Sequence, residues 1–217
     1  MTAEPLPSLE RSTLREQALA ALRSAILSGR YGPGDHLGEV EIASYLSISR
    51  GTVREALRHL QQEGLVAPGV RGKLMVRSLS PDEVRELYRV RGALEGLAVG
   101  EIVSSGRAQQ AVAGLEEALG ALERAESLEE RIEADLGFHA RLCELSGNSM
   151  LLQSWKHLEG PTRVVVVSAT AGERALSTSA EHHRPIVQAI GRGDAAAARA
   201  VLDEHMSEAA ERLTTTA

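Results

Sequence analysis

The side chains best suited to bind a metal ion lie in the second half of this 217-residue chain. Asp135 and His139 are four residues apart, so on a helix they would share one face and could bind one ion together. Three of the histidines further toward the C-terminus, His182, His183 and His205, could join them. If packed helices carry these residues, three histidines and one carboxylate from three helices could meet around a divalent cation.

The same residues allow simpler interpretations. An Asp-x-x-x-His pair is commonly a hydrogen bond between an imidazole N–H and a carboxylate, and histidines can pack in a helical core without any metal. A metal-dependent hydrolase or isomerase is a further alternative. The sequence places no additional Glu, and no Ser with a base, beside these residues to transfer a proton, which counts against an enzyme.

A second group of functional side chains is a row of arginines. Arg50, Arg54 and Arg58 recur at four-residue spacing in the stretch SRGTVREALRHL, so a helix there would carry three positive charges on one face. Like charges at this spacing repel by a few tenths of a kcal/mol per pair, roughly, and a group outside the helix should offset that cost. Phosphates could do so. A solvated face with Glu55 as the partner is the alternative.

The charge of the chain is unevenly distributed. The net charge is -6, yet residues 1–77 contain 10 Lys and Arg against 8 Asp and Glu, whereas residues 78–217 contain 14 against 22. Residues 50–77 alone carry six basic and two acidic side chains. A local basic patch of this kind attracts phosphates even when the whole protein is acidic.

Composition excludes several classes of protein. Aromatic residues make up 2% of the chain, which is too few for a surface that stacks single-stranded bases. The one cysteine, Cys143, cannot form an internal disulfide or a cysteine-based metal cluster, and its simplest role is that of a small core residue. No apolar run reaches the length of a membrane span, and the N-terminus is charged where a secretory signal would be apolar. We therefore expect a cytoplasmic protein without a membrane partner.

The elements that must position the arginines form a winged helix-turn-helix over residues 1–77. Apolar residues recur with helical spacing in three segments, at residues 14–27, 40–46 and 53–63. The second and third segments are separated by Ser47-Ile48-Ser49, a turn of helix-turn-helix length, and Gly64 ends the third. Two short apolar runs around Pro68–Gly72 then predict a small β-hairpin, the wing.

An all-helical, antiparallel bundle is expected from residue 82 to 217, after a linker at 78–81. Ser80-Pro81-Asp82 is a helix start signal. The predicted helices lie near residues 82–104, 108–125, 128–146, 149–170, 177–191 and 194–213. Residues 163–167, RVVVV, favour a strand by propensity, but a lone strand would have no partner here, so we predict a buried helix. The fold class is thus mainly α.

The first third of the chain resembles the GntR-family winged helix-turn-helix. The run from RSAILSGRYGPGDHL through SRGTVREALRHLQQEGL to the wing RGKLMV matches the family pattern over residues 12–77. The resemblance implies DNA contacts from the following residues: Ser49, Arg50, Gly51, Thr52 and Arg54 in the recognition helix, and Arg71, Gly72 and Lys73 in the wing. Where the family often has a base-contacting arginine after Glu39, this chain has Val40.

The second half resembles the FCD effector domain of the FadR subfamily over residues 82–213. The resemblance rests on Asp-x-x-x-His followed by SAEHHRPIVQAIGRGDAAAARAVLDEHM, with a second histidine 22 residues after His183. It implies four metal ligands: Asp135, His139, His183 and His205. It also places Arg91 as a clamp for an effector's carboxylate, and an intrahelical pair with Glu95 is the alternative for that arginine.

These expectations combine into one predicted function. The resemblance implies a transcription regulator, most often a repressor in this family, rather than an enzyme. A homodimer would bind a palindromic operator in double-stranded DNA because half-sites at fixed spacing require two copies. The expected effector is a small carboxylate or sugar acid bound at a divalent metal ion, with zinc favoured and nickel or manganese as alternatives. A regulator without bound metal and a metal-dependent enzyme remain the competing hypotheses.

Overall fold

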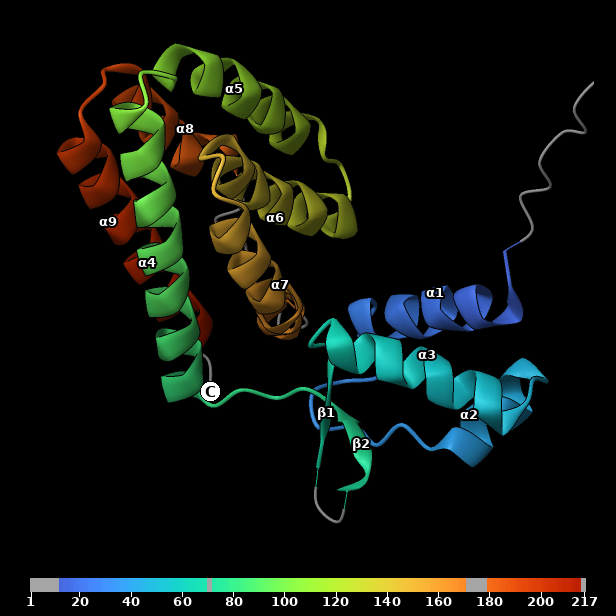
Figure 1. Cartoon of the computed structure of the whole chain (residues 1–217). Coiled ribbons are helices and arrows are strands. Elements are labelled where there is room, and N and C mark those ends of the chain that lie inside the picture. Colours follow the sequence, from blue (N-terminus) through green and yellow to red (C-terminus); the bar gives the residue numbers. More distant parts are fainter. Residues whose placement is uncertain (1–11, 70–71, 171–178, 216–217) are drawn as a thin grey trace, which may run out of the picture.

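A computed structural model of the chain describes residues 12–69, 72–170 and 179–215. Within these ranges the chain forms nine helices and one two-stranded antiparallel sheet. A small N-terminal unit of three helices and the sheet is followed by a six-helix bundle (Figure 1). This confirms the mainly α fold. The connecting residues 77–80 are neither helix nor strand, and the exact domain boundaries stay a prediction.

The N-terminal unit is built on three short helices, α1 (Leu14–Leu27), α2 (Glu39–Leu46) and α3 (Arg50–Gln62). Thr13 starts α1 with a capping box, because its side chain accepts from the N–H of Glu16 while the Glu16 carboxylate accepts from the Thr13 N–H. Ser47 ends α2 in the left-handed region, at φ 53°, and Ser49 caps α3 two residues later. The tight turn expected between α2 and α3 is present.

The wing is a pair of three-residue strands, β1 (Val66–Pro68) and β2 (Leu74–Val76), with Val66 opposite Val76. Gly72, at φ +73°, lies in the left-handed region that a turn of this kind requires. The core beneath α1, α2, α3 and the wing is aliphatic, and its fully buried members include Val53, Leu57, Leu60 and Val66.

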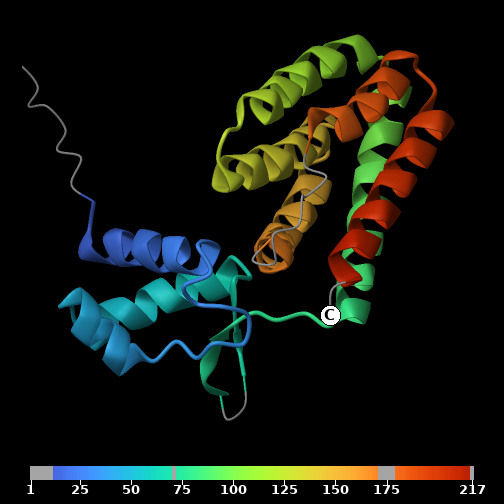
Figure 2. The ribbon, with the colours of Figure 1, turned by 180° about the vertical axis from the view of Figure 1, so that it is seen from behind.

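The bundle contains six helices, α4 (Pro81–Ser104), α5 (Ala108–Arg124), α6 (Leu128–Leu145), α7 (Ser149–Thr170), α8 (Ala180–Gly191) and α9 (Ala195–Thr214). Figures 1 and 2 show α4 and α9 side by side along their lengths, while α5 packs on α6 and α8. The helix predicted at 177–191 begins at Ala180, and residues 177–178 lie outside the described ranges. None of the described helices is long and apolar enough to cross a membrane.

Helix α7 contains the valine run that favoured a strand by propensity. The prediction of a buried helix is confirmed. The reason is that successive valines of the run face different apolar clusters: Val164 packs in the N-terminal unit, Val165 in the bundle core, and Val166 beside Ile132 and Leu136 of α6. A helix buried on several sides accepts apolar residues without helical periodicity, so tertiary packing overrides propensity here.

Candidate functional site

Three histidines from three helices of the bundle meet in its interior. His139 comes from α6, His183 from α8 and His205 from α9, and one ring nitrogen of each lies within 4.8 Å of the others. The Nε2 atoms of His139 and His183 are 3.3 Å apart. Two nitrogen ligands of one zinc ion, each about 2.0–2.1 Å from it in tetrahedral geometry, would be separated by about 3.3 Å. The spacing therefore fits a metal ion without rearrangement of these two rings.

The outer faces of these two rings are held by hydrogen-bond acceptors. His139 Nδ1 lies 2.6 Å from Glu95 Oε2, and His183 Nδ1 lies 3.0 Å from the carbonyl oxygen of Ser179. Both Nδ1 atoms must donate, so in neutral imidazoles both Nε2 atoms carry lone pairs. These lone pairs face each other inside the site. A cation between them, a proton or a metal ion, would make this arrangement favourable.

Asp135 adds a carboxylate to the same point. It lies one turn before His139 on α6, and its Oδ1 is 3.2 Å from His183 Nε2. Burial alone would raise the pKa of this carboxyl, but its interactions with the neighbouring imidazoles of His183 and His139 outweigh that effect and hold the pKa below the usual value. Asp135 is thus charged at neutral pH. The group of mutually close donor atoms found among the described residues contains the three histidines without Asp135.

Arg91 lies beside this site and is buried at 1% exposure. Its Nε donates to Glu95 Oε1 over 3.2 Å, so the intrahelical pair with Glu95 is formed. The guanidinium also lies over the rings of Tyr88 and Trp155, 5.0 and 5.9 Å from their centroids. Its second terminal nitrogen, NH2, has no hydrogen-bond partner in the described part of the chain, although Glu95 is close enough for a charge interaction. A buried N–H without an acceptor is costly unless a ligand supplies one.

Glu95 connects the arginine, the histidine and a third element. Its carboxylate accepts from Arg91, from His139 and from the indole Nε1 of Trp155 on α7, which is 2.8 Å from Oε1. Burial alone would raise the pKa of Glu95, but the neighbouring positive groups outweigh it and lower that pKa. The sequence indicated Glu95 only as a partner for Arg91. The contact with Trp155 spans 60 positions and has no local signal in the sequence.

The five residues predicted to contact DNA from the recognition helix lie at the N-terminal end of α3. Ser49 accepts from the N–H of Thr52 and thereby begins the helix. Arg54 forms two hydrogen bonds with Glu39 of α2, at 2.9 and 2.7 Å, and Arg50 lies 3.9 Å from the same carboxylate. The charge repulsion within the row is therefore partly offset inside the protein, by Glu39.

The other residues considered for DNA binding lie further along α3, in the wing and on α2. Arg58 pairs with Glu55 on its own helix at 2.7 Å, which is the solvated arrangement considered for it. Gly72 and Lys73 are exposed at the tip of the wing, whereas Arg71 lies outside the described residues. Val40, in the position where the family often has an arginine, is 62% exposed on α2. Its side chain offers no hydrogen bond to a base.

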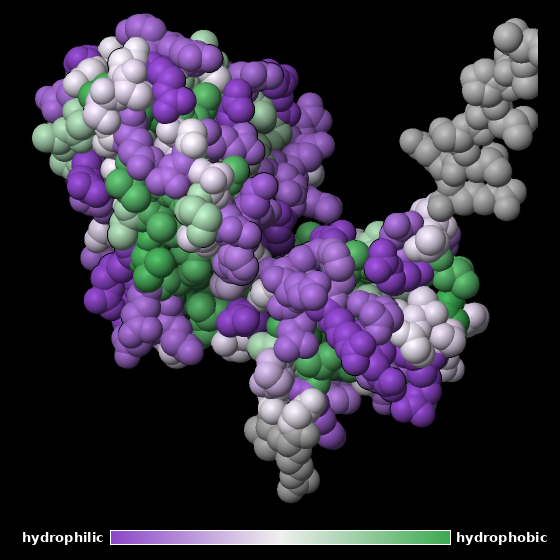
Figure 3. All heavy atoms as spheres, viewed as in Figure 1, coloured by the Kyte–Doolittle hydropathy of each residue, from purple (hydrophilic) through white to green (hydrophobic). Residues whose placement is uncertain are grey.

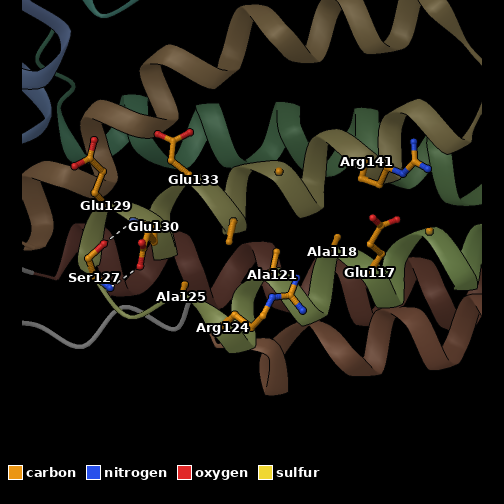
Figure 4. Close-up of a pocket in the computed structure, with 13 residues that line it drawn as sticks. Glu117, Ala118, Ala121, Arg124, Ala125, Ser127, Glu129, Glu130, Glu133 and Arg141 are labelled. Atoms are coloured by element: carbon orange, nitrogen blue, oxygen red, sulfur yellow. Dashed lines mark hydrogen bonds between the residues drawn. The ribbon is translucent and has the colours of Figure 1, made fainter. Parts of the chain in front are cut away.

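A surface groove elsewhere in the bundle is separate from these residues. It lies between α5 and α6, has a volume of about 1150 Å³, and is lined by small residues such as Ala118 and Ala121 with Glu117, Glu133 and Arg141 at its edges (Figure 4). None of the predicted site residues lines it. The groove therefore does not mark the metal or effector site.

Comparisons with known proteins agree with this arrangement. A model of the bacterial regulatory proteins of the gntR family matches residues 14–71, and a model of the FCD domain matches residues 86–208. The "Probable D-xylose utilization operon transcriptional repressor" of Paenarthrobacter nicotinovorans is 31% identical over 92% of this chain and 88% of its own length. The "Uxu operon transcriptional regulator" of Escherichia coli strain K12 is 29% identical over 89% of this chain and 84% of its own.

Solved structures show the same likeness. A GntR regulator from Rhodococcus sp. RHA1 superimposes with a TM-score of 0.75 at 25% identity and covers 94% of this chain and 98% of its own. E. coli McbR/YncC shares the fold, with a TM-score of 0.72 at 22% identity over 94% of this chain and 99% of its own. The winged helix-turn-helix, the helical bundle and these matches lead to one conclusion: the chain belongs to the GntR family of DNA-binding transcription regulators and carries an FCD domain.

Proposed function

We propose that this regulator is a ligand-controlled repressor whose effector binds at a metal ion inside the FCD domain. The observation that carries the proposal is the set of acceptor atoms turned toward one point by His139, His183 and Asp135. A divalent ion there would neutralise them and leave coordination positions open for an effector. His205 completes the proposed ligands. Zinc suits a site rich in imidazole, and nickel or manganese are the alternatives.

The effector that fits this site is a small carboxylate or sugar acid. Arg91 supports this choice because its buried guanidinium has one nitrogen without a hydrogen-bond partner among the described residues. A guanidinium of this kind prefers a carboxylate oxygen. Glu95 Oε1 lies 3.2 Å from both Nε and NH2 of Arg91 and so fixes the guanidinium beside the histidine site, where it would bind an anion.

The proposed DNA contacts are Ser49, Arg50, Gly51, Thr52 and Arg54 at the start of α3, with Arg71, Gly72 and Lys73 in the wing. The N-terminal end of α3 is the part of a helix-turn-helix that enters the major groove. The Arg54 side chain is 46% exposed, and its ion pair with Glu39 fixes it beside the N-terminal end of α3, where it would meet DNA. A palindromic operator then requires a homodimer.

An apolar stripe on α4 supports the homodimer. Val90 and Leu97 are 50% and 44% exposed, and Ala93 lies between them on the same face. Figure 3 shows apolar residues gathered over α4. If two copies of α4 packed antiparallel about the level of residue 95, Val90 would lie opposite Gly100 and Ala93 opposite Leu97, so that large residues meet small ones.

The same register brings opposite charges together. Arg89, which is exposed, would lie opposite Glu101 of the second copy. Oε2 of Glu101 is buried and has no partner in the described residues. The complementarity of both size and charge makes a second copy of the chain the occupant that this face fits.

A mobility-shift experiment tests the proposed function. The full-length protein, loaded with zinc, is expected to retard duplex DNA from upstream of its own gene at about 0.15 M salt, and one member of a panel of small carboxylic and sugar acids should release it. His183→Ala should lose both the metal and the response to the acid while still binding DNA. His182→Ala is the matched control, because His182 is exposed and points away from the site, hydrogen-bonded to Ser179.

Two results would contradict the proposal. If the wild type retained less than about 0.2 metal per chain after gentle purification, the metal would be absent, since metal occupancy and folding are tightly coupled at such sites. If His183→Ala and wild type responded equally to every acid that releases DNA, the effector would bind elsewhere.

A further inference from the structure

Helix α7 is in direct contact with both the DNA-binding unit and the histidine site. Near its middle, Gly160 and Pro161 touch the turn Glu63–Gly64 that ends α3 (Figures 1 and 2). A Cβ at Gly160 would overlap the carbonyl oxygen of Glu63, and a Cβ at Gly64 would lie 2.7 Å from Pro161 Cδ. Glycine inside a helix costs about 1 kcal/mol relative to alanine, so its presence here reflects the close approach of two backbones.

Apolar and charged contacts strengthen this joint. Val164, one turn after Gly160, is buried in the core of the N-terminal unit. Arg23 of α1 donates twice to Glu63, at 3.1 and 2.5 Å, and so fixes the end of α3. Arg163 of α7 pairs with Glu159 at 3.0 Å and with Glu133 of α6. A displacement of α7 at this level would therefore carry the end of the recognition helix with it.

The histidine site acts on the same helix from the other side. Trp155 precedes Gly160 by five residues, which is about 7.5 Å along a helix. Its indole donates to Glu95 Oε1 at 2.8 Å, and Glu95 Oε2 binds His139 Nδ1 at 2.6 Å. One carboxylate thus connects a histidine of the site to α7. Pro161 lacks the N–H that would bond to the carbonyl of His157, so α7 can bend between the two contacts.

We propose that α7 transmits the state of the histidine site to the recognition helix, through Trp155 at one contact and Gly160–Pro161 at the other. The part of this proposal that concerns metal binding at the histidine site rests on the proposed function. The contacts of α7 are independent of it. With a cation bound at its Nε2 atom, His139 would change the hydrogen bond that its Nδ1 donates to Glu95. Glu95 then shifts Trp155, and α7 moves the turn Glu63–Gly64. Trp155 and Gly160 are positioning residues, because neither touches DNA or the proposed ligand.

Hydrogen exchange on the full-length protein tests this route, with zinc alone as the probe. The amides of Glu63, Gly64 and Leu65 are hydrogen-bonded to the end of α3, so their exchange reports on that end. Addition of zinc to the EDTA-stripped wild type is expected to change exchange at these amides by at least about threefold.

Two variants and one control separate the contacts. Gly160→Ala should abolish the zinc-dependent change, because its Cβ displaces the turn from α7. Gly137→Ala is the matched control, since a Cβ there meets nothing within 4 Å. Trp155→Phe keeps an aromatic ring but loses the donor to Glu95, and it should reduce the change by at least about half while still binding zinc. It also serves as the test if Gly160→Ala fails to fold.

Each outcome has a defined meaning. A zinc-dependent change of equal size in Gly160→Ala, Trp155→Phe and wild type would overturn the route through α7. One zinc per chain with no change at the three amides would overturn the coupling and leave the proposed metal site intact. No bound zinc in the wild type would overturn both.

Discussion

Two buried imidazoles decide how the site behaves with pH. Burial lowers the pKa of His139, and it lowers the pKa of His205 to about 2, with the neighbouring histidines adding to the effect. Both side chains are therefore neutral in the folded protein at pH 7. Neutral imidazole is the form that donates a lone pair to a metal ion. The protonation state of both side chains is thus the one that the proposed metal site requires.

The metal-free protein should lose stability as pH falls from 7 to 5. In the unfolded chain each histidine takes up a proton near pH 6.5, whereas in the folded chain burial lowers the pKa of His139 and of His205, so both take up a proton only at lower pH. The unfolded state therefore binds more protons below pH 6.5, and the free energy of unfolding decreases by up to about 1.4 kcal/mol per pH unit for each of the two. Urea unfolding in EDTA at pH 7, 6 and 5 measures this slope.

A variant separates this effect from general acid sensitivity. Glu95 and Asp135 have lowered pKa values, so both remain charged in the folded state across this pH window. His205→Gln removes one of the two titrating groups and should give a shallower slope than wild type. An unchanged slope would mean that His205 is not neutral in the folded protein.

The sequence predicts helix α3 well, but it does not predict the residue of α2 that pairs with Arg54. Its apolar positions Val53, Ala56, Leu57 and Leu60 are all buried, as their spacing predicted. The partner of Arg54 was not predictable, because Glu39 lies 15 residues away and only the packing of α2 on α3 brings it near. Local periodicity specifies which face of a helix is buried, and the packing of helices decides which charges meet.

Replacement of Arg54 by alanine should weaken DNA binding. The change removes a positive side chain at the N-terminal end of α3 and leaves the Glu39 carboxylate without its main partner. We expect a loss of about 1–3 kcal/mol in binding free energy, which is roughly 5- to 150-fold in affinity, and a salt dependence shallower by about one unit. Fluorescence anisotropy of labelled duplex DNA over a range of salt concentrations measures both.

The control for this variant is Arg212→Ala. Arg212 is also an exposed arginine in an ion pair, but it lies on α9 with Glu208 as its partner. Wild-type affinity is expected for it. If Arg54→Ala bound DNA as tightly as Arg212→Ala, α3 would not contact DNA through this residue.

The helical bundle shows the same division between predictable and unpredictable features. The bounds of α4 to α7 and α9 lie within a residue or two of those expected from breaks in the sequence, since Gly, Ser and Pro mark helix ends by their local conformations. Three of the four ligands that the resemblance implies, His139, His183 and His205, have donor atoms close to one another. The contact of Trp155 with Glu95 and that of Gly160 with Glu63 arise from packing alone.

At the scale of the whole molecule, the exposed face of α4 predicts the oligomeric state. Leu97→Glu places a charge in the apolar stripe, and a twofold interface would contain the change twice. Loss of about 1.5 kcal/mol per copy raises the dissociation constant of the dimer by about 150-fold. Sedimentation velocity at micromolar concentration should show the variant as a monomer and the wild type as a dimer.

The matched control is Met150→Glu. Met150 is a large apolar residue that is 69% exposed at the start of α7, and it is not part of the α4 stripe. This variant should sediment like the wild type. A dimeric Leu97→Glu would show that another surface joins the two copies.

The position of Trp155 also means that intrinsic tryptophan fluorescence can report ligand binding. The chain has one tryptophan, and this indole lies between the carboxylate that holds His139 and the stretch of α7 that supports the recognition helix. Its ultraviolet emission therefore comes from a single, defined place. A change in colour or intensity on addition of a metal ion or an organic acid would report events in the FCD domain without any attached dye. Candidate effectors can be screened in this way before any operator is known.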